Sequence, residues 1–358
     1  MALPVIPPIE PMLAKSAAAV PTGGYLYEPK WDGFRCLVFR DGDDIELGSR
    51  GGKPLTRYFP ELIASLAEAL PPRCVLDGEI VVVRGSRLDF DGLSDRIHSA
   101  ESRIRLLAEQ TPATFVAFDV LALDDEDLMG RPLAQRHEVL VRLFAPHPHV
   151  RVSRSTQDPD LARTWFETFE GAGLDGVVAK PLDGTYRPGE RAMVKVKHER
   201  TADVVVAGYR LHKSGPVVGS LMLGLYLEAG VLNYVGGASA FTTARRAELV
   251  DELAPLVVPE GEEHPWTGED DGGHRRPGTL NRWNAGKDRS FVALRPERVC
   301  EVRYDQLQAD RFRHSARFLR WRPDRQPESC GYDQLDLPAA YDLADVLGPA
   351  DQSASSAG

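Results

Sequence analysis

Residues 28–35 read Glu-Pro-Lys-Trp-Asp-Gly-Phe-Arg and place Lys30 in a Lys-x-Asp-Gly frame. Lysine is scarce in this chain, with eight lysines among the 43 basic residues. Where arginine is so strongly preferred, a retained lysine often has a task that guanidinium cannot perform, such as acting as a nucleophile or as a compact charge on phosphate. The frame alone also fits an exposed strand end that runs into an Asp-Gly turn.

Six further segments follow this frame in order. They are Ser49-Arg50-Gly51-Gly52, Leu76-Asp77-Gly78-Glu79-Ile80, Phe118-Asp119-Val120-Leu121, Asp175-Gly176-Val177-Val178-Ala179-Lys180, Met193-Val194-Lys195-Val196-Lys197 and Arg322-Pro323-Asp324-Arg325. The set resembles the covalent nucleotidyltransferase superfamily, and most closely the ATP-dependent DNA ligases of the bacterial stand-alone ligase C type. Each segment is weak evidence alone, and their order and spacing over residues 10–325 carry the resemblance.

A chain of 358 residues favours two domains. Residues 1–198 read as a mixed α+β domain, and the resemblance identifies it as an adenylation (nucleotidyltransferase) domain. Residues 199–350 show short strands and glycine turns that suit an OB-fold β-barrel. The tail over 351–358 is expected to be disordered.

Hydrophobic periodicity gives the expected elements of both domains. In the first domain we expect two strands within 25–47 that meet in a turn at 41–44, further strands at 74–84, 115–123, 176–180 and 192–197, and helices at 60–70, 99–109, 131–144 and 160–171. In the second we expect strands at 204–211, 221–228, 231–236, 299–307 and 318–322.

The net charge of −10 opposes a nucleic-acid partner, because phosphate binding favours a basic surface. However, residues 281–325 hold twelve Lys and Arg against six Asp and Glu. Such a stretch is either a DNA-binding face or an ordinary solvated face.

The cellular location is expected to be the bacterial cytosol or nucleoid. The first residues lack a basic segment and are interrupted by prolines, unlike a signal peptide, and no apolar run is long enough to span a membrane. The four cysteines form no Cys-x-x-Cys pair, which argues against zinc and against a disulfide framework. We expect a cytoplasmic monomer without membrane contact.

The resemblance implies that the Lys30 amine attacks the α-phosphorus of ATP, expels pyrophosphate and carries AMP covalently. Attack requires a neutral amine, whereas free lysine has a pKa of about 10.4. Lys195 and Lys197 alternate on one strand, so their ammonium groups share a face and can lower that pKa while holding the α-phosphate. The alternative for this pair is a strand edge protected by charge.

The resemblance assigns the remaining nucleotide contacts residue by residue. Arg35 and Glu79 would contact the ribose hydroxyls, Phe118 would stack on adenine, and Glu28 would read the adenine amino group. Arg50 would hold the 5′-phosphate of the nick.

Three further positions depart from the family pattern or vary within it. Asp175, where glutamate is more usual, would hold Mg²⁺ or Mn²⁺ together with Glu79, and its shorter side chain suggests contact through water. Lys180 lines the nucleotide site, at a position where the superfamily tolerates other residues. Met193 stands where related ligases often have tryptophan.

Arg322, Asp324 and Arg325 resemble an Arg-x-Asp-Lys signature in which arginine replaces the final lysine. In the family this element orients pyrophosphate during the first step, and arginine retains the ability to bind phosphate. The alternative is a surface Arg–Asp ion pair.

Together these features favour an ATP- and Mg²⁺- or Mn²⁺-dependent DNA ligase that seals nicks in duplex DNA during repair. A repair polymerase, primase or other repair protein would act in trans. One alternative is an RNA ligase or a GTP-dependent capping-type nucleotidyltransferase, which shares the lysine chemistry. Another is a non-catalytic OB-fold nucleic-acid-binding protein.

Overall fold

The computed structural model describes residues 2–144, 147–259, 261–267, 274–277, 290–336 and 338–348. It divides into a first unit, Met1–Lys197 with Pro338–Gly358, and a second unit, His198–Leu337. The division falls one residue from the expected boundary, but residues 338–348, expected in the barrel domain, lie in the first unit. Residues 281–289 of the arginine-rich stretch and the expected tail 351–358 lie outside the described residues.

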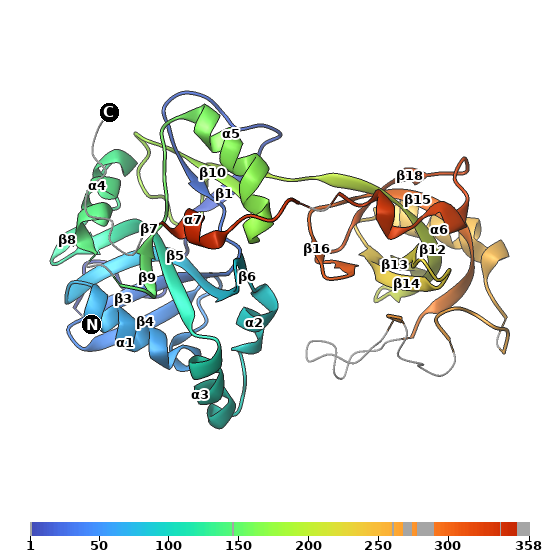
Figure 1. Ribbon diagram of the computed structural model, residues 1–358, viewed down its shortest axis with the longest axis horizontal. Helices are drawn as coiled ribbons and strands as arrows, with labels where there is room; N and C mark the ends of the chain where they lie inside the picture. The colour runs from blue at the N-terminus through green and yellow to red at the C-terminus, as the bar shows by residue number, and fades with distance from the viewer. Residues whose placement is uncertain are drawn as a thin grey trace. The chain divides into compact units, whose positions relative to one another are not determined.

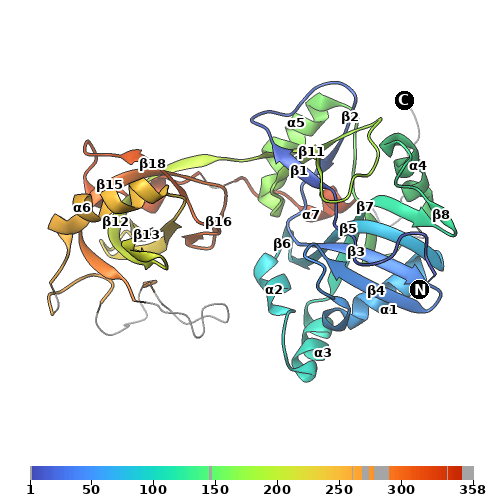
Figure 2. The same ribbon diagram turned by 180° about the vertical axis from the view of Figure 1, so that it is seen from behind.

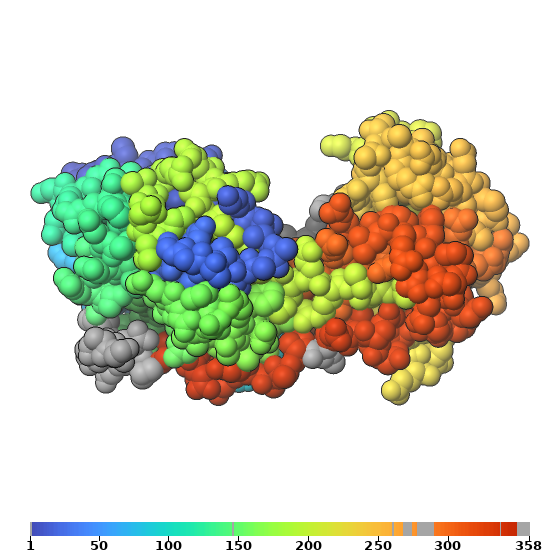
Figure 3. All heavy atoms as spheres, turned by 90° about the horizontal axis from the view of Figure 1, so that it is seen from above, coloured from blue at the N-terminus to red at the C-terminus, as the bar shows by residue number. Residues whose placement is uncertain are grey.

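The smaller sheet of the first unit brings distant parts of the sequence together. In order across the sheet, its strands are β1 (Leu13–Ser16), β11 (Arg191–Lys197), β10 (Gly176–Pro181) and β2 (Tyr25–Pro29). β1 runs parallel to β11, and in Figure 3 the blue N-terminal residues lie against yellow-green ones accordingly. Glu28, Val178 and Lys195 are in register across three strands and share one face.

The larger sheet of the first unit has the order β4–β3–β5–β7–β8, with β6 paired to β5 and β9 to β7. Its strands are β3 (Phe34–Asp41), β4 (Asp44–Ser49), β5 (Arg73–Arg84), β6 (Arg87–Leu88), β7 (Ala113–Leu123), β8 (Glu126–Asp127) and β9 (Val150–Val152). The expected turn at 41–44 joins β3 to β4. Because β2 belongs to the other sheet, residues 25–47 form parts of three strands and not the expected two.

All four helices expected in the first unit are present: α1 (Pro60–Ala69), α3 (Glu101–Gln110), α4 (Leu133–Leu143) and α5 (Pro159–Thr168). α1 begins at proline, which has no N–H to leave unpaired, and buries Leu62 and Leu66 at i, i+4 spacing. The short α2 (Phe90–Asp95) was not expected.

After the second unit the chain returns to the first and forms α7 (Leu343–Leu347). Figures 1 and 2 both show this red helix beside the strands of the first unit. Leu343 and Val346 are buried in the hydrophobic cluster that also contains Trp31 and Phe118. Residues at the far end of the sequence therefore complete the core of the first unit.

The absence of a side chain at Gly171 leaves room for the segment that returns to the first unit. A Cβ atom at Gly171 would lie 1.9 Å from the carbonyl oxygen of Ala339, which is closer than any side chain allows. The neighbouring Phe169 ring packs against Tyr341, with 5.1 Å between centroids.

The second unit is a five-stranded antiparallel sheet in the order β14–β13–β12–β15–β18. Its strands are β12 (Arg200–His212), β13 (Gly215–Tyr226), β14 (Leu232–Ala238), β15 (Val292–Tyr304) and β18 (Arg317–Trp321), and they contain most of each of the five expected strands. A parallel bridge between Ala238 and Ala316 links the two outer strands, so the sheet curls into a barrel. The short strands β16 (Leu307–Gln308) and β17 (Arg311–Phe312) form a hairpin beside it.

One helix of the second unit, α6 (Thr243–Leu253), was missed by the sequence analysis. Thr242 precedes it, and its side-chain oxygen accepts the Arg245 N–H, which is a usual N-cap arrangement. Leu249 and Leu253 are buried at i, i+4 spacing. These features were visible in the sequence.

Leu343→Ala tests the contribution of α7 to the first unit. The change removes a buried side chain, so we expect the unfolding free energy to fall by about 2–5 kcal/mol. Asp345→Ala, on the exposed side of the same helix, is the control and should change stability little. Denaturant unfolding of the full chain measures both, and equal stability of the two variants would contradict the assignment.

Candidate active site

Lys30 lies where the chain passes from one sheet to the other. β2 ends at Pro29 and β3 begins at Phe34, so residues 30–33 form the crossing. The Lys30 N–H donates to the Gly176 carbonyl at 2.8 Å, and the Asp175 N–H donates to the Lys30 carbonyl at 3.0 Å. These two bonds fix the Lys30 backbone beside the start of β10.

Gly33 accounts for the glycine of the Lys-x-Asp-Gly frame. A Cβ atom at this position would lie 2.2 Å from the Ile80 carbonyl oxygen and 3.0 Å from the Glu79 side chain. The crossing therefore packs this closely on β5 only with glycine. The frame is a connection between sheets and not an exposed turn.

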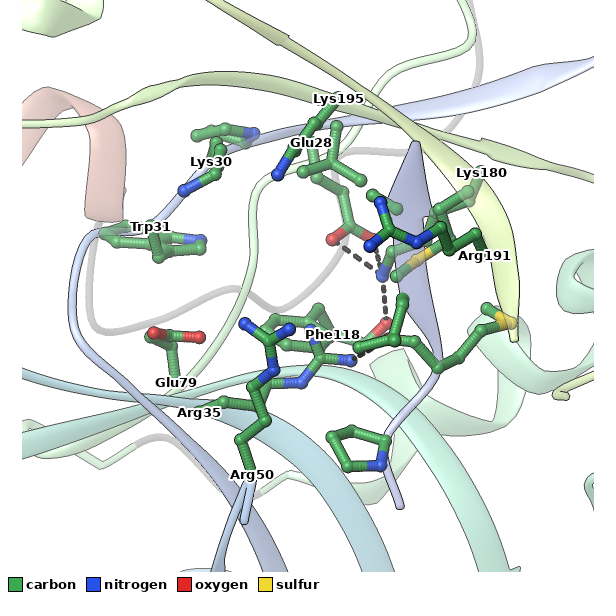
Figure 4. A pocket seen from close by; sticks show the side chains of 17 residues that line it. Glu28, Lys30, Trp31, Arg35, Arg50, Glu79, Phe118, Lys180, Arg191 and Lys195 are labelled. Atoms are coloured by element: carbon green, nitrogen blue, oxygen red, sulfur yellow. Dashed lines mark hydrogen bonds and ion pairs between the residues drawn. The ribbon is translucent and has the colours of Figure 1, made fainter. Parts of the chain in front are cut away.

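A pocket of about 220 Å³ lies between the two sheets (Figure 4). The larger sheet contributes Phe118 together with Arg35 and Glu79, which are directly opposite each other on β3 and β5. The smaller sheet contributes Glu28 and Pro29 of β2 and alternate residues of β10 and β11. The whole lining consists of Pro11, Met12, Leu13, Ala14, Glu28, Pro29, Lys30, Trp31, Arg35, Arg50, Glu79, Phe118, Val178, Lys180, Arg191, Met193 and Lys195.

Asp175 holds two of the lysines that the sequence analysis singled out. Its Oδ2 atom lies 2.6 Å from the Lys30 Nζ atom and 2.9 Å from the Lys197 Nζ atom. Burial alone would raise the pKa of Asp175, but the two ammonium groups outweigh it and lower this pKa below its usual value. Asp175 therefore stays ionised and links Lys30 to β11.

Lys195 points into the pocket from the same strand as Lys197 (Figure 4). Its pKa is lowered by partial burial, and by the nearby positive charges of Lys197 and Lys30. The expectation that β11 directs both ammonium groups toward one side agrees with these contacts. The alternative of a strand edge that only faces solvent does not fit, because Lys197 pairs with buried Asp175.

Two cations lie close to the Phe118 ring. The Arg35 guanidinium carbon and the Lys180 Nζ atom each lie 4.5 Å from the ring centroid. Phe118 is 7% exposed and lines the pocket. An aromatic face held in this way offers a flat apolar surface to a ligand.

Lys180 and Glu28 form a buried ion pair beside this ring. Both Glu28 carboxylate oxygens lie 2.9 Å from the Lys180 Nζ atom, which also donates to the Phe118 carbonyl at 2.9 Å. Burial raises the pKa of Glu28 to about 7, although Lys180 opposes the shift. Lys180 thus supports the pocket wall through Glu28.

Glu79 is a second carboxylate with an altered pKa. Burial raises its pKa to about 7, against the opposing effects of Arg35 and Lys30. Within the described part of the chain, the Glu79 carboxylate accepts no hydrogen bond, and no group of three or more His, Cys, Asp and Glu residues forms a metal site. Glu79 and Asp175 still fit a hard cation such as Mg²⁺, because this ion commonly takes one or two carboxylates and completes its shell with phosphate and water oxygens.

Several lining residues were missed by the sequence analysis. Arg191 occupies the same face of β11 as Met193 and Lys195, and the two-residue period of the strand was the signal for it. Trp31 lies beside Lys30, and its indole N–H donates to the Ser153 hydroxyl at 2.9 Å. Arg50, which was expected, is exposed and reaches the pocket from the end of β4.

The late segment lies in the second unit. The Arg322 guanidinium donates to both Asp203 oxygens, at 2.9 and 3.0 Å, and to Asp324 at 2.7 Å. The Arg322 hydrogen bond lowers the pKa of Asp324 to about 2. The Nε atom of Arg325 lies 3.3 Å from Asp203. These contacts match the ion-pair alternative and leave a role toward nucleotide as a proposal.

None of the helices in the described ranges has the length and apolar character needed to cross a membrane.

Comparisons with known proteins agree with this architecture. Residues 11–197 match the ATP dependent DNA ligase domain, and residues 214–325 match the ATP dependent DNA ligase C terminal region. DNA ligase C of Mycobacterium tuberculosis is 54% identical over 356 residues, which cover 97% of this chain and 99% of that protein. DNA ligase C1 of Mycolicibacterium smegmatis is 54% identical over 358 residues, with the same coverage.

A solved structure from a structure–function study of Lig E DNA ligases shares the fold. It has a TM-score of 0.56 at 18% identity and covers 87% of this chain and 99% of that chain. The predicted combination of a nucleotidyltransferase domain and an OB-fold barrel is thereby confirmed. With both domain matches and near-full-length relatives in agreement, the chain belongs to the ATP-dependent DNA ligase family.

Proposed function

We propose that this chain seals nicks in duplex DNA through a lysyl-N–AMP intermediate on Lys30. The observation that carries the proposal is the position of the Lys30 amine at a pocket that also presents an aromatic ring, a guanidinium and a carboxylate. These groups suit a base and sugar hydroxyls, and the cations around Lys30 suit phosphates.

In the first step the neutral Lys30 nitrogen attacks the α-phosphorus of ATP. An N–P bond forms, the bond to the bridging oxygen breaks, and pyrophosphate leaves. Lys30, whose side chain is partly exposed, must first lose a proton to solvent, and Asp175 remains paired with Lys197 when Lys30 becomes neutral. A buried carboxylate left without any partner would be strongly unfavourable.

The pocket walls support the proposed nucleotide contacts. Phe118 stacks on adenine, and Glu28, held by Lys180, meets the amino group of the base. Arg35 and Glu79 lie side by side on neighbouring strands, and both meet the sugar. Lys195 meets the α-phosphate.

Glu79 and Asp175 would hold Mg²⁺ or Mn²⁺, which neutralises phosphate charge as the bond to pyrophosphate breaks. For Asp175 this contact would run through water, because its Oδ2 atom is already paired with both neighbouring lysines. Met193, which replaces the usual tryptophan, is buried at the pocket wall and contributes packing.

In the later steps the 5′-phosphate of the nick takes AMP from Lys30, and the 3′-hydroxyl then displaces AMP. Arg50 is exposed at the pocket and suits the 5′-phosphate. Arg322, Asp324 and Arg325 act on pyrophosphate in the first step, which requires Arg322 or Arg325 to exchange its contact with Asp203 for phosphate. The protein works as a cytoplasmic monomer in DNA repair, beside a polymerase or primase supplied in trans.

Lys30→Arg tests the covalent step. The chain should take up label from α-labelled ATP with metal, the label should survive denaturation, and both Lys30→Arg and Lys30→Ala should abolish it because neither side chain provides a nucleophilic amine. Lys15→Arg, at an exposed position on β1, is the matched control and should retain full labelling. Label from GTP would favour a capping enzyme, and wild-type chain without label would favour the binding protein.

The pH dependence of labelling tests the carboxylates. Since the pKa values of Glu28 and Glu79 are raised to about 7, both lose their charge as the pH falls through that value. A protonated Glu79 is a poor metal ligand, so the initial labelling rate should fall by at least about tenfold between about pH 8 and about pH 6. Asp91→Asn, at an exposed carboxylate, should show the wild-type profile. A flat profile over this range would contradict the prediction.

Removal of the barrel tests whether adenylation and nick sealing depend on the second unit. Deleting residues 201–358 also removes α7, so a second variant should replace residues 198–337 with a Gly/Ser linker and keep 338–348. We expect this variant to take up label at least about tenfold more slowly and to lose sealing of nicked duplex, because it lacks the barrel cations that meet phosphates. Normal sealing by this variant would refute the two-domain mechanism.

A further inference from the structure

Tyr186 lies behind the pocket, outside its lining, and is 4% exposed. Its hydroxyl donates to the Oδ2 atom of Asp77 at 2.6 Å and accepts the Met12 N–H at 3.0 Å. Asp77 is completely buried, and Met12 belongs to the segment that forms one pocket wall. One hydroxyl thus joins a buried carboxylate to the backbone of the wall.

Asp77 in turn holds Arg35 through two bonds. The Arg35 Nε atom donates to Asp77 Oδ1 and the Nη2 atom donates to Asp77 Oδ2, each at 2.6 Å. The Nη2 atom also donates to the Met12 carbonyl at 3.3 Å. Met12, Tyr186, Asp77 and Arg35 therefore form a closed ring of hydrogen bonds.

This ring leaves one part of Arg35 for a ligand. Three of its five N–H groups are directed to Asp77 and Met12, and within the described residues no bond to the two N–H groups of Nη1 is found. The guanidinium also lies over Phe118 and is directly opposite Glu79 on the neighbouring strand. Contacts with Asp77, Met12 and Phe118 therefore fix the orientation of the Arg35 guanidinium.

We propose that the Tyr186 hydroxyl is a positioning group that aims Arg35 at the sugar of the bound nucleotide and so sets a preference for ribose over 2′-deoxyribose. This inference rests on the proposed function, in which Arg35 meets the ribose hydroxyls. Its chemical basis is the difference between a guanidinium held in one orientation and one that is free to turn about its own side chain.

Tyr186 is suited to this role because its hydroxyl remains a donor. Burial and the adjacent Asp77 carboxylate raise the pKa of Tyr186 well above its usual value. Removing only the hydroxyl would leave Asp77 Oδ2 without one donor and the buried Met12 N–H without its acceptor. The ring of hydrogen bonds would then be open at two places, and the two groups that hold Arg35, Asp77 and the Met12 carbonyl, would no longer be joined to each other through Tyr186.

The test is Tyr186→Phe in the full chain, with the apparent KM and the maximal rate of single-turnover self-adenylation measured separately for ATP and for 2′-deoxy-ATP. We expect KM for ATP to rise about tenfold, the size of effect produced by one hydrogen bond to a charged group, with the maximal rate within about twofold of wild type. KM for 2′-deoxy-ATP should change by less than about twofold, because that sugar lacks the 2′-hydroxyl at which Arg35 is aimed. The ratio of the two KM values is the readout that a loss of stability alone would not move.

Tyr27→Phe is the matched control. Its hydroxyl donates to the Pro21 carbonyl at 2.7 Å in the same unit, its side chain is fully buried, and it lies on the face of β2 opposite Glu28. The control should lose stability without changing the KM ratio. Asp77→Asn changes the acceptor of the bonds from Tyr186 and Arg35 and should also reduce the preference for ATP over 2′-deoxy-ATP.

An unchanged KM ratio in Tyr186→Phe would overturn the inference, including the case in which both KM values rise equally. A reduced ratio in Tyr27→Phe as well would overturn it, because any lost buried hydroxyl would then suffice. Failure of wild-type chain to take up label from ATP is a separate result and would overturn the proposed function itself.

Discussion

One carboxylate, that of Asp175, connects the elements on which the site depends. Asp175 lies just before β10. It pairs with Lys30, on the crossing between the sheets, and with Lys197, at the end of β11. Its backbone N–H also holds the Lys30 carbonyl. Two cations on one buried anion keep that anion ionised and leave it paired when either cation changes. This arrangement allows Lys30 to become a neutral nucleophile without leaving an unpaired charge in the core around it.

The other buried charges near Phe118 are also paired with charges of opposite sign. Arg35 pairs with Asp77, Lys180 with Glu28, and Arg136 with Asp119 at 2.8 Å, so each of these three cations has its own anion. Isolated charges would be too costly in this interior, whereas paired and hydrogen-bonded ones hold their side chains in one orientation. The pocket wall is therefore rigid before any nucleotide arrives. Rigidity of this kind reduces the entropy lost on binding.

The sequence revealed the parts of the site whose signals are local. The residues of the Lys-x-Asp-Gly frame lie within a few positions of one another, and so do the two alternating lysines of β11. The two-residue period of a strand places Lys195 at the pocket. Tyr186 and Met12 gave no such signal, because they meet only through tertiary packing over 174 residues of sequence. Likewise, α7 is too short for a recognisable period, and no pattern showed that it would return to the first unit. Asp77 was quoted within its motif but received no role, since its partner Arg35 is identifiable only from strand register.

The path of the chain has a consequence for how the site forms. The second unit is inserted into the first, which the chain leaves at Lys197 and rejoins at Pro338. Leu343 and Val346 then complete the hydrophobic cluster that includes Trp31 and Phe118. Domains generally fold as units during synthesis, the N-terminal part first. Here the core behind the nucleotide pocket stays incomplete until the barrel has been made, so the first unit reaches its full stability only when the barrel is already attached to it.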